Sequence, residues 1–130
     1  MRRTTVLLPL ALVVAVAGCG GTKSYSLEKT RACLTKEEGV RLTQVPASDF
    51  IAQAAPGGAI RVVVPGNRVT ISFGSDQKEA DRIAQGYRTF RGKSIGSVIA
   101  DLLRPDRNAV LLWKQHPSPD DLDLVNGCLK

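Results

Sequence analysis

The chain has 130 residues, of which 43% are hydrophobic, 5% aromatic and 23% charged, and its formal net charge at pH 7 is +6. This length suits one domain with a modest hydrophobic core, and the sequence contains no internal repeat or low-complexity stretch. A basic excess would raise nucleic acid as a partner in an intracellular protein, so the compartment of the chain has to be inferred first.

The first residues are laid out as an export signal. Arg2 and Arg3 give a positive start, and residues 6–17 form an apolar run that is broken only by Pro9. The run is too short to span a hydrocarbon core, which needs about 20 residues. An exported chain is therefore predicted, with no membrane span in this segment.

The apolar run ends on the tetrapeptide Val16-Ala17-Gly18-Cys19. An aliphatic residue, two small residues and a cysteine in this order resemble the lipobox of bacterial lipoproteins. The resemblance covers residues 1–19 alone. It implies that residues 1–18 are a signal peptide, that Cys19 carries palmitate-type acyl chains, and that the protein is held at the cell membrane on its extracytoplasmic side. The alternative is an ordinary secretory signal that happens to contain a cysteine.

Removing residues 1–18 leaves 112 residues, and the loss of Arg2 and Arg3 lowers the net charge from +6 to +4. Residues 19–24 are small and polar and predict a flexible tether, followed by a single α+β domain at 25–130. Outside the cytoplasm nucleic acid is not expected. Anionic lipid head groups, a cell-wall polymer or an envelope protein are the expected partners, unless the charge serves solubility alone.

Two cysteines remain once Cys19 is acylated, Cys33 and Cys128. In an oxidising compartment a remaining pair most simply forms a disulfide. This bridge would close a loop of roughly 95 residues, which chain-entropy arguments value at about 4.7 kcal/mol. The alternatives are two free thiols or a redox couple, and the absence of a Cys-x-x-Cys motif disfavours the couple.

Three elements are predicted before the middle of the chain. A helix is expected over residues 26–38, because Ser26 suits the N-cap and Gly39 suits the C-terminal stop. Residues 40–44 alternate apolar and polar side chains as a strand does. A short helix is expected within residues 46–55, beginning at Ser48.

A β-hairpin is predicted at residues 59–64 and 68–73, which are both β-branched and apolar. Gly66-Asn67 fits a two-residue turn and would place Val64 opposite Val69. The apolar side chains of both strands then share one face of the sheet. The opposite face carries the polar side chains that we take as a candidate binding face, namely Arg61, Arg68, Thr70 and Ser72.

Helical spacing of apolar side chains predicts a helix from Asp76 to Phe90 and a second apolar stripe over residues 95–103, closed by Pro105. Residues 108–115 read as a strand that is apolar on both faces. Ser118-Pro119 opens a final helix. The order from residue 40 to 115 predicts a ferredoxin-like (βαββαβ) antiparallel sheet, with extra N- and C-terminal helices.

Few residues suggest chemistry. Heavy-metal-binding domains of the ferredoxin-like plan carry two cysteines in the loop after the first strand, but residues 44–48 contain neither sulfur nor imidazole. Asp120, Asp121 and Asp123 fit helix capping better than a calcium loop, so no metal and no cofactor are predicted. His116 is the only histidine, and Asp120 or Asp121 could orient it as a general base.

A membrane-anchored, non-catalytic binding or interaction module of the cell envelope is therefore the leading functional hypothesis. The alternative is a small envelope hydrolase or transferase that uses His116. A third hypothesis is a structural subunit of a larger envelope complex. The basic cluster Arg88, Arg91 and Lys93 at a predicted helix end could contact phosphates or simply be solvated.

Overall fold

A five-stranded antiparallel sheet forms the centre of the structure, a computed structural model that describes residues 23–91 and 96–130. The expected signal peptide, Cys19 and most of the tether lie outside these residues. The helices and strands are α1 (Leu27–Leu34), β1 (Arg41–Thr43), α2 (Phe50–Gln53), β2 (Ala59–Val64), β3 (Asn67–Phe73), α3 (Gln77–Phe90), the 3₁₀ turn η1 (Gly96–Val98), α5 (Ile99–Leu102), β4 (Leu103–Asp106), β5 (Ala109–Trp113) and α6 (Pro119–Gly127).

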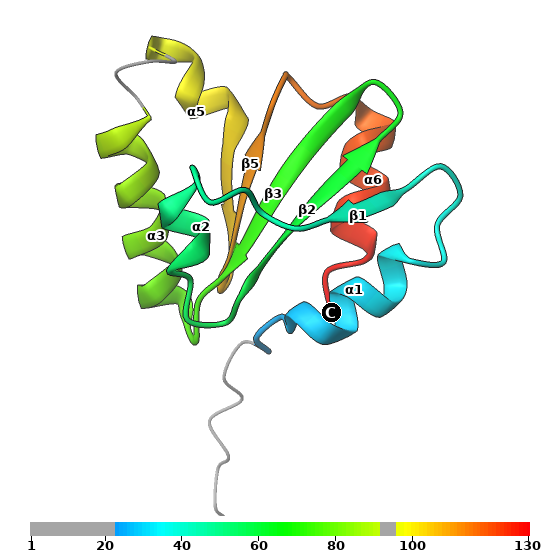
Figure 1. Cartoon of the computed structure of the whole chain (residues 1–130), viewed down its shortest axis with the longest axis horizontal. Helices are drawn as coiled ribbons and strands as arrows, with labels where there is room; N and C mark the ends of the chain where they lie inside the picture. The colour runs from blue at the N-terminus through cyan, green and yellow to red at the C-terminus, as the bar shows by residue number, and fades with distance from the viewer. Residues whose placement is uncertain (1–22, 92–95) are drawn as a thin grey trace, which may run out of the picture.

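The strands lie in the order β1-β2-β3-β5-β4, and each neighbouring pair is antiparallel. Helices cover both faces of the sheet: α1 and α6 lie on one side, and α2, α3 and α5 lie on the other (Figure 1). The predicted α+β class is confirmed. The sheet thus separates two layers of side chains. The layer under α1 and α6 is apolar, and the layer under α2, α3 and α5 includes polar and charged side chains.

The ferredoxin-like topology is not confirmed, because the sheet has five strands with β1 at one edge and β4 at the other. In the ferredoxin-like plan the first strand lies inside the sheet, whereas β1 lies at the edge and pairs with β2. A second difference arises at residues 103–106, which the apolar stripe places at the end of a helix and which instead form β4. Leu103 pairs with Leu112, and Pro105 pairs with Val110. An edge strand tolerates proline, which has no N–H to donate. The predicted helix is reduced to η1 and the four-residue α5.

The β2–β3 hairpin forms, but its predicted register is wrong by two residues. Val64 pairs with Asn67, so the turn consists of Pro65 and Gly66. A proline followed by a glycine at φ +78° is the pattern of a type II turn. Because side chains alternate between faces with a period of two, a shift of two residues leaves every side chain on its predicted face.

The face under α1 and α6 is apolar and forms the main core. Val69, Ile71 and Trp113 lie on it, each 1% exposed or less. Leu34 of α1 and Val125 of α6 are completely buried in the same cluster. Burial of side chains of this size contributes about 1.5–3 kcal/mol each before the cost of ordering the chain. This layer holds the terminal helices against the sheet.

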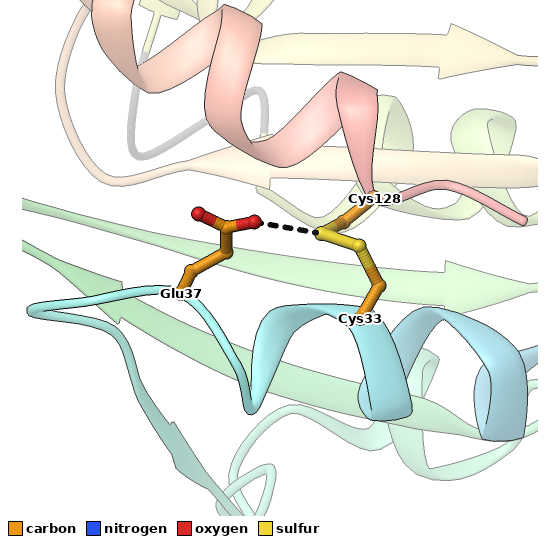
Figure 2. Close-up of side chains that lie close together, drawn as sticks. All are labelled: Cys33, Glu37 and Cys128. Atoms are coloured by element: carbon orange, nitrogen blue, oxygen red, sulfur yellow. Dashed lines mark hydrogen bonds between the residues drawn. A yellow bond between two sulfur atoms is a disulfide. The ribbon is translucent and has the colours of Figure 1, made fainter.

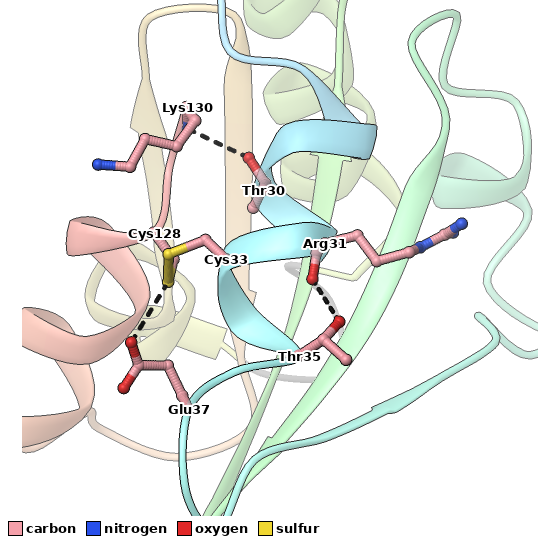
Figure 3. The surroundings of a disulfide bond; sticks show 7 residues. All are labelled: Thr30, Arg31, Cys33, Thr35, Glu37, Cys128 and Lys130. Carbon is pink, nitrogen blue, oxygen red and sulfur yellow. Dashed lines mark hydrogen bonds between the residues drawn. A yellow bond between two sulfur atoms is a disulfide. The ribbon is translucent and has the colours of Figure 1, made fainter.

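The predicted disulfide joins α1 to the end of α6. The sulfurs of Cys33 and Cys128 are bonded at 2.05 Å, with their Cα atoms 5.3 Å apart and 95 residues between them in sequence. The backbone N–H of Lys130 also donates to the hydroxyl of Thr30 at 3.2 Å (Figure 3). The helix α1 is shorter than predicted and ends at its C-cap Thr35, so that the following residues form turns instead of continuing the helix.

The helix α3 covers the second face. The Asp76 carboxylate accepts a hydrogen bond from the N–H of Glu79 at 2.8 Å, as a helix N-cap does, and Ile83 and Tyr87 are buried. Phe90 was expected on the same apolar face but is 62% exposed. Its ring meets Phe50 edge-on at 5.2 Å between centroids, because α2 lies beside the end of α3.

Candidate anion-binding site

A cavity of about 200 Å³ opens on the second face of the sheet, at the end where α3 finishes. We call it the arginine pocket. Its polar lining consists of Asp49, Arg61, Arg68, Thr70, Arg91 and Lys114. A larger groove of about 580 Å³ lies beside β1, but Arg31 is the one charged residue in its described lining. Charge therefore distinguishes the smaller cavity from this groove. A third cavity, of about 310 Å³, is lined by Arg41, Arg68 and Lys114, but Arg61 with its buried donor lines the arginine pocket and not this one.

The floor of the pocket follows from strand alternation. Arg61 of β2 lies directly opposite Thr70 of β3, and Arg68 is two residues before Thr70 on the same strand. Residues two apart on a strand, and residues directly opposite on its neighbour, point to the same face. Because the adjacent Val62 and Val69 point into the apolar core, the two arginines must point the other way.

The wall of the pocket is built on a buried carboxylate. Asp49 is 2% exposed and accepts a hydrogen bond from the N–H of Ala52 at 3.1 Å, which caps α2. Arg91, at the C-terminal end of α3, lies 3.4 Å from the second carboxylate oxygen. A buried charge is costly unless it is paired and hydrogen-bonded, and Asp49 meets both conditions.

Tyr87, in the last turn of α3, completes this arrangement. Its hydroxyl lies 3.2 Å from both carboxylate oxygens of Asp49 and 3.5 Å from the hydroxyl of Ser72. Burial raises the pKa of Tyr87, with a smaller contribution from the Asp49 charge. The phenol therefore stays protonated and donates a hydrogen bond to Asp49. Because that hydrogen is used, the Ser72 hydroxyl acts as the donor to the Tyr87 oxygen.

Arg61 has an unsatisfied donor at the floor of the pocket. Its Nε is buried and has no hydrogen-bond partner among the residues that the structure describes. Burial lowers the pKa of Arg61, and repulsion from Arg68 lowers it further. Two guanidinium groups thus approach each other in a partly desolvated place. An anion between them would satisfy the donor and remove the repulsion.

The lining of the pocket carries a positive excess. Arg61, Arg68, Arg91 and Lys114 provide four positive charges, and Asp49 provides one negative charge. In a cavity walled by protein such an excess attracts anions more strongly than it would on an open surface. The arrangement offers many hydrogen-bond donors to an anion.

The predicted binding face is present in part. Arg61, Arg68 and Thr70 line the arginine pocket, although Thr70 is only 5% exposed. Ser72 is wrong as a contact residue, because it is completely buried and its hydroxyl lies against Tyr87. The face is not an open surface, since α2 and α3 cover most of it and leave the pocket as its accessible part.

Sequence reasoning missed Asp49 and Lys114 as site residues. Asp49 reads as an ordinary helix start, and no local pattern tells that its carboxylate is buried against α3. Arg91 belongs to the basic cluster that was singled out at the predicted helix end, and it is the member that reaches the pocket. Arg88 is exposed, and Lys93 lies outside the described residues.

His116 has a different partner from those predicted. Its Nδ1 lies 2.6 Å from a carboxylate oxygen of Asp101, and the imidazole is 70% exposed. The hydrogen bond from His116 is the main cause that lowers the pKa of Asp101. Asp121 instead bonds to Ser118 in a capping box at the start of α6. The predicted orientation of His116 by Asp120 or Asp121 is therefore wrong.

A carboxylate lies beside the disulfide. Figure 2 shows Glu37, in the turn after α1, reaching toward Cys128, with its oxygen 3.9 Å from the sulfur. The three side chains of Cys33, Glu37 and Cys128 have their potential ligand atoms within 4.8 Å of one another, which resembles a metal-binding arrangement. Both sulfurs are consumed in the disulfide, so neither is the thiolate that a metal needs.

Comparison of the chain with protein-family models, with curated proteins and with solved structures found no match. Within residues 23–91 and 96–130, no helix is both long enough and apolar enough to cross a membrane. The functional argument therefore depends on the signal sequence and on the arginine pocket.

Proposed function

We propose that this chain is a lipid-anchored lipoprotein on the extracytoplasmic side of the cell membrane, and that its domain binds an anionic ligand without catalysing a reaction. The observation that carries the binding proposal is the buried, unsatisfied Nε of Arg61, placed in a cavity with an excess of positive charge. A buried donor without a partner is rare in folded proteins, and a bound anion explains it.

The lipobox-like tetrapeptide that ends at Cys19 supports the anchor. The disulfide between Cys33 and Cys128 agrees with an oxidising compartment, where such bonds persist. The membrane then acts as a partner through the acyl chains, and an envelope protein or a cell-wall polymer that carries anionic groups is the partner expected at the pocket. Nucleic acid is not a partner in this compartment.

Changing Cys19 to Ala tests the anchor. We expect the wild-type chain in the membrane fraction, with a mass that shows cleavage before Cys19 and added acyl chains. The variant should lose the acyl mass and leave the membrane fraction after a salt wash. A wild-type protein that retains residues 1–18, or one whose mass shows no acyl group, would contradict the proposal.

The binding site is tested on the full chain in a neutral detergent, by thermal unfolding in a series of anions at constant ionic strength. A ligand that binds the folded state stabilises it by an amount that grows with the logarithm of the ratio of ligand concentration to Kd, and so raises the melting temperature. We expect at least one oxyanion to do so in the wild type and in Arg88→Met, an exposed control on α3. Arg61→Met should lose the effect. Equal responses of Arg61→Met and the control would count against a site in the pocket.

The second candidate function, a small envelope hydrolase or transferase, depends on the pairing of His116 with Asp101 at 2.6 Å. A carboxylate of this kind can orient an imidazole that acts as a general base. Replacing His116 with Ala separates the two functions. It should leave anion binding unchanged if the protein is a binding module, and it should abolish any turnover if the protein is an enzyme.

A further inference from the structure

We infer that the arginine pocket takes a tetrahedral oxyanion, a phosphate or sulfate group, in preference to a carboxylate. This inference deepens the proposed function and rests on it. Three properties of the pocket carry the choice: the directions from which its donors come, the engagement of its one carboxylate by donors of the protein, and its size.

The donors approach from two walls. Arg61 and Arg68 rise from neighbouring strands of the sheet, whereas Arg91 comes from the end of α3 in the helical layer above. The oxygens of a carboxylate lie in one plane with its carbon and suit a single guanidinium fork. A tetrahedral oxyanion points its oxygens in several directions and can therefore be reached from the sheet and from the helix at the same time.

The one carboxylate of the pocket is largely committed to donors of the protein itself. An ionised carboxylate accepts about four hydrogen bonds. One oxygen of Asp49 accepts the N–H of Ala52, the single hydroxyl of Tyr87 is shared between both oxygens, and Arg91 lies 3.4 Å from the second oxygen. A ligand in the pocket thus meets donors from the arginines and finds most of the acceptor capacity of Asp49 taken. This selects groups that only accept hydrogen bonds, as a phosphodiester or a sulfate ester does.

The size of the cavity fits such a group. Its volume is about 200 Å³. Since one water molecule takes about 30 Å³ of liquid, the cavity holds on the order of seven water-sized groups. A phosphate or sulfate group has five atoms besides hydrogen, so the remaining space is that of the atoms that join it to a larger molecule.

The pocket and the start of the described chain lie at opposite ends of β5. Near the start, the N–H of Tyr25 donates to the side chain of Asn108 at 2.6 Å, just before β5 begins. Lys114 follows the other end of β5 and lines the pocket. Six residues of strand span about 20 Å. An anchored domain can therefore turn the pocket away from its own membrane. In that orientation the bound phosphate or sulfate group would belong to a solute or a polymer. A lipid head group is the other source of the same chemistry.

The experiment is a calorimetric titration of the full chain in neutral detergent, at a slightly alkaline pH and constant ionic strength. The ligands are phosphate, sulfate and malonate, which all carry about two negative charges under these conditions. We expect phosphate and sulfate to bind at least tenfold more tightly than malonate. Arg61→Met should weaken both by about tenfold or more, and Arg88→Met should match the wild type.

Two results would overturn the inference in different ways. If malonate binds as tightly as sulfate and Arg61→Met weakens both, the pocket recognises charge alone. The proposed anion binding then stands, and the preference for a tetrahedral group is wrong. If none of the three anions binds, the proposed anion site fails together with the inference.

Arg61→Lys sharpens the test, because it keeps the positive charge and removes the buried Nε donor. We expect it to bind phosphate nearly as weakly as Arg61→Met does, and wild-type affinity in Arg61→Lys would overturn the role of that donor. Doping the detergent micelles with phosphatidylglycerol distinguishes the source. Competition with phosphate in the wild type, absent from Arg61→Met, identifies a lipid phosphodiester as the bound group; a lack of competition assigns the group to a solute or polymer.

Discussion

The hydroxyl of Tyr87 lies 3.2 Å from both carboxylate oxygens of Asp49, and the two side chains are almost completely buried. The contact joins residues 38 positions apart and fixes the start of α2 to the last turn of α3. Asp49 in turn holds Arg91 at the wall of the arginine pocket. The stability of the helical layer and the geometry of the candidate site thus depend on the same carboxylate.

Removing the Tyr87 hydroxyl should destabilise the protein. Tyr87→Phe leaves the buried carboxylate of Asp49 without one of its donors, which costs about 1–3 kcal/mol of unfolding free energy. Urea denaturation measures the change. Tyr25→Phe is the control, because its hydroxyl bonds to Asp106 at 3.1 Å in a partly exposed place where water can substitute. A Tyr87→Phe variant no less stable than Tyr25→Phe would contradict the structural role of the buried contact.

Removing the charge of Arg61 should not lower the unfolding free energy when no anion is bound. Arg61→Met keeps an unbranched stem and removes the repulsion from Arg68, so the unfolding free energy at low salt should stay equal or rise by up to about 1 kcal/mol. The gain should shrink as salt is added. Urea denaturation at two salt concentrations measures it, with Arg88→Met as the reference for the general loss of one positive charge. A marked loss of stability in Arg61→Met would mean that the guanidinium already has a stabilising partner.

The pKa of Asp101 should respond to His116. In the wild type the hydrogen bond from His116, with a smaller effect of Arg104, holds the pKa of Asp101 below its ordinary value of 3.8. A lowered carboxyl pKa adds stability above the ordinary value, and that stability is lost as the pH falls through the folded-state pKa. His116→Ala should therefore raise the pKa of Asp101, as followed by carbon-detected NMR during an acid titration. Arg104→Met should raise the pKa of Asp101 less than His116→Ala does. A larger effect of Arg104→Met would show that Arg104, and not His116, is the main cause of the lowered pKa.

Loss of the disulfide should cost more than any of these changes. Replacing Cys33 and Cys128 together with Ala should lower the unfolding free energy by about 2–5 kcal/mol. Thermal and urea unfolding should then match those of the wild-type chain with a reducing agent. Glu37→Gln keeps the bond and changes only its neighbour, so it should behave as the oxidised wild type does. Insensitivity of the wild type to reduction would show that the bond is not formed in solution.

Features that depend on local chemistry could be predicted from the sequence. Asp76 and Ser118 cap α3 and α6 as their positions indicate. The two faces of the β2–β3 hairpin follow from alternation, even though the turn was placed one residue late. The pairing of Cys33 with Cys128 follows from a count of cysteines in a chain that the sequence predicts to be exported.

Features that depend on tertiary packing could not be predicted from the sequence. The apolar residues 102–103 suit a helix as well as a strand, and pairing with β5 decides that residues 103–106 form β4. Arg61, Arg68 and Thr70 share a strand face and were found by alternation. Asp49 and Arg91 reach the same cavity from two helices, and no periodicity in the sequence relates a helix start to the end of another helix.

The disulfide also determines how the domain carries mechanical load. Residues 34–127 lie inside the loop that it closes. A pull between the proposed lipid anchor at Cys19 and residues 129–130 would run through one covalent sulfur–sulfur bond and bypass the sheet. Such tension would leave the β2–β3 hairpin, α2 and α3 unstretched until the bond is reduced, whereas a pull on a ligand in the arginine pocket would act inside the closed loop.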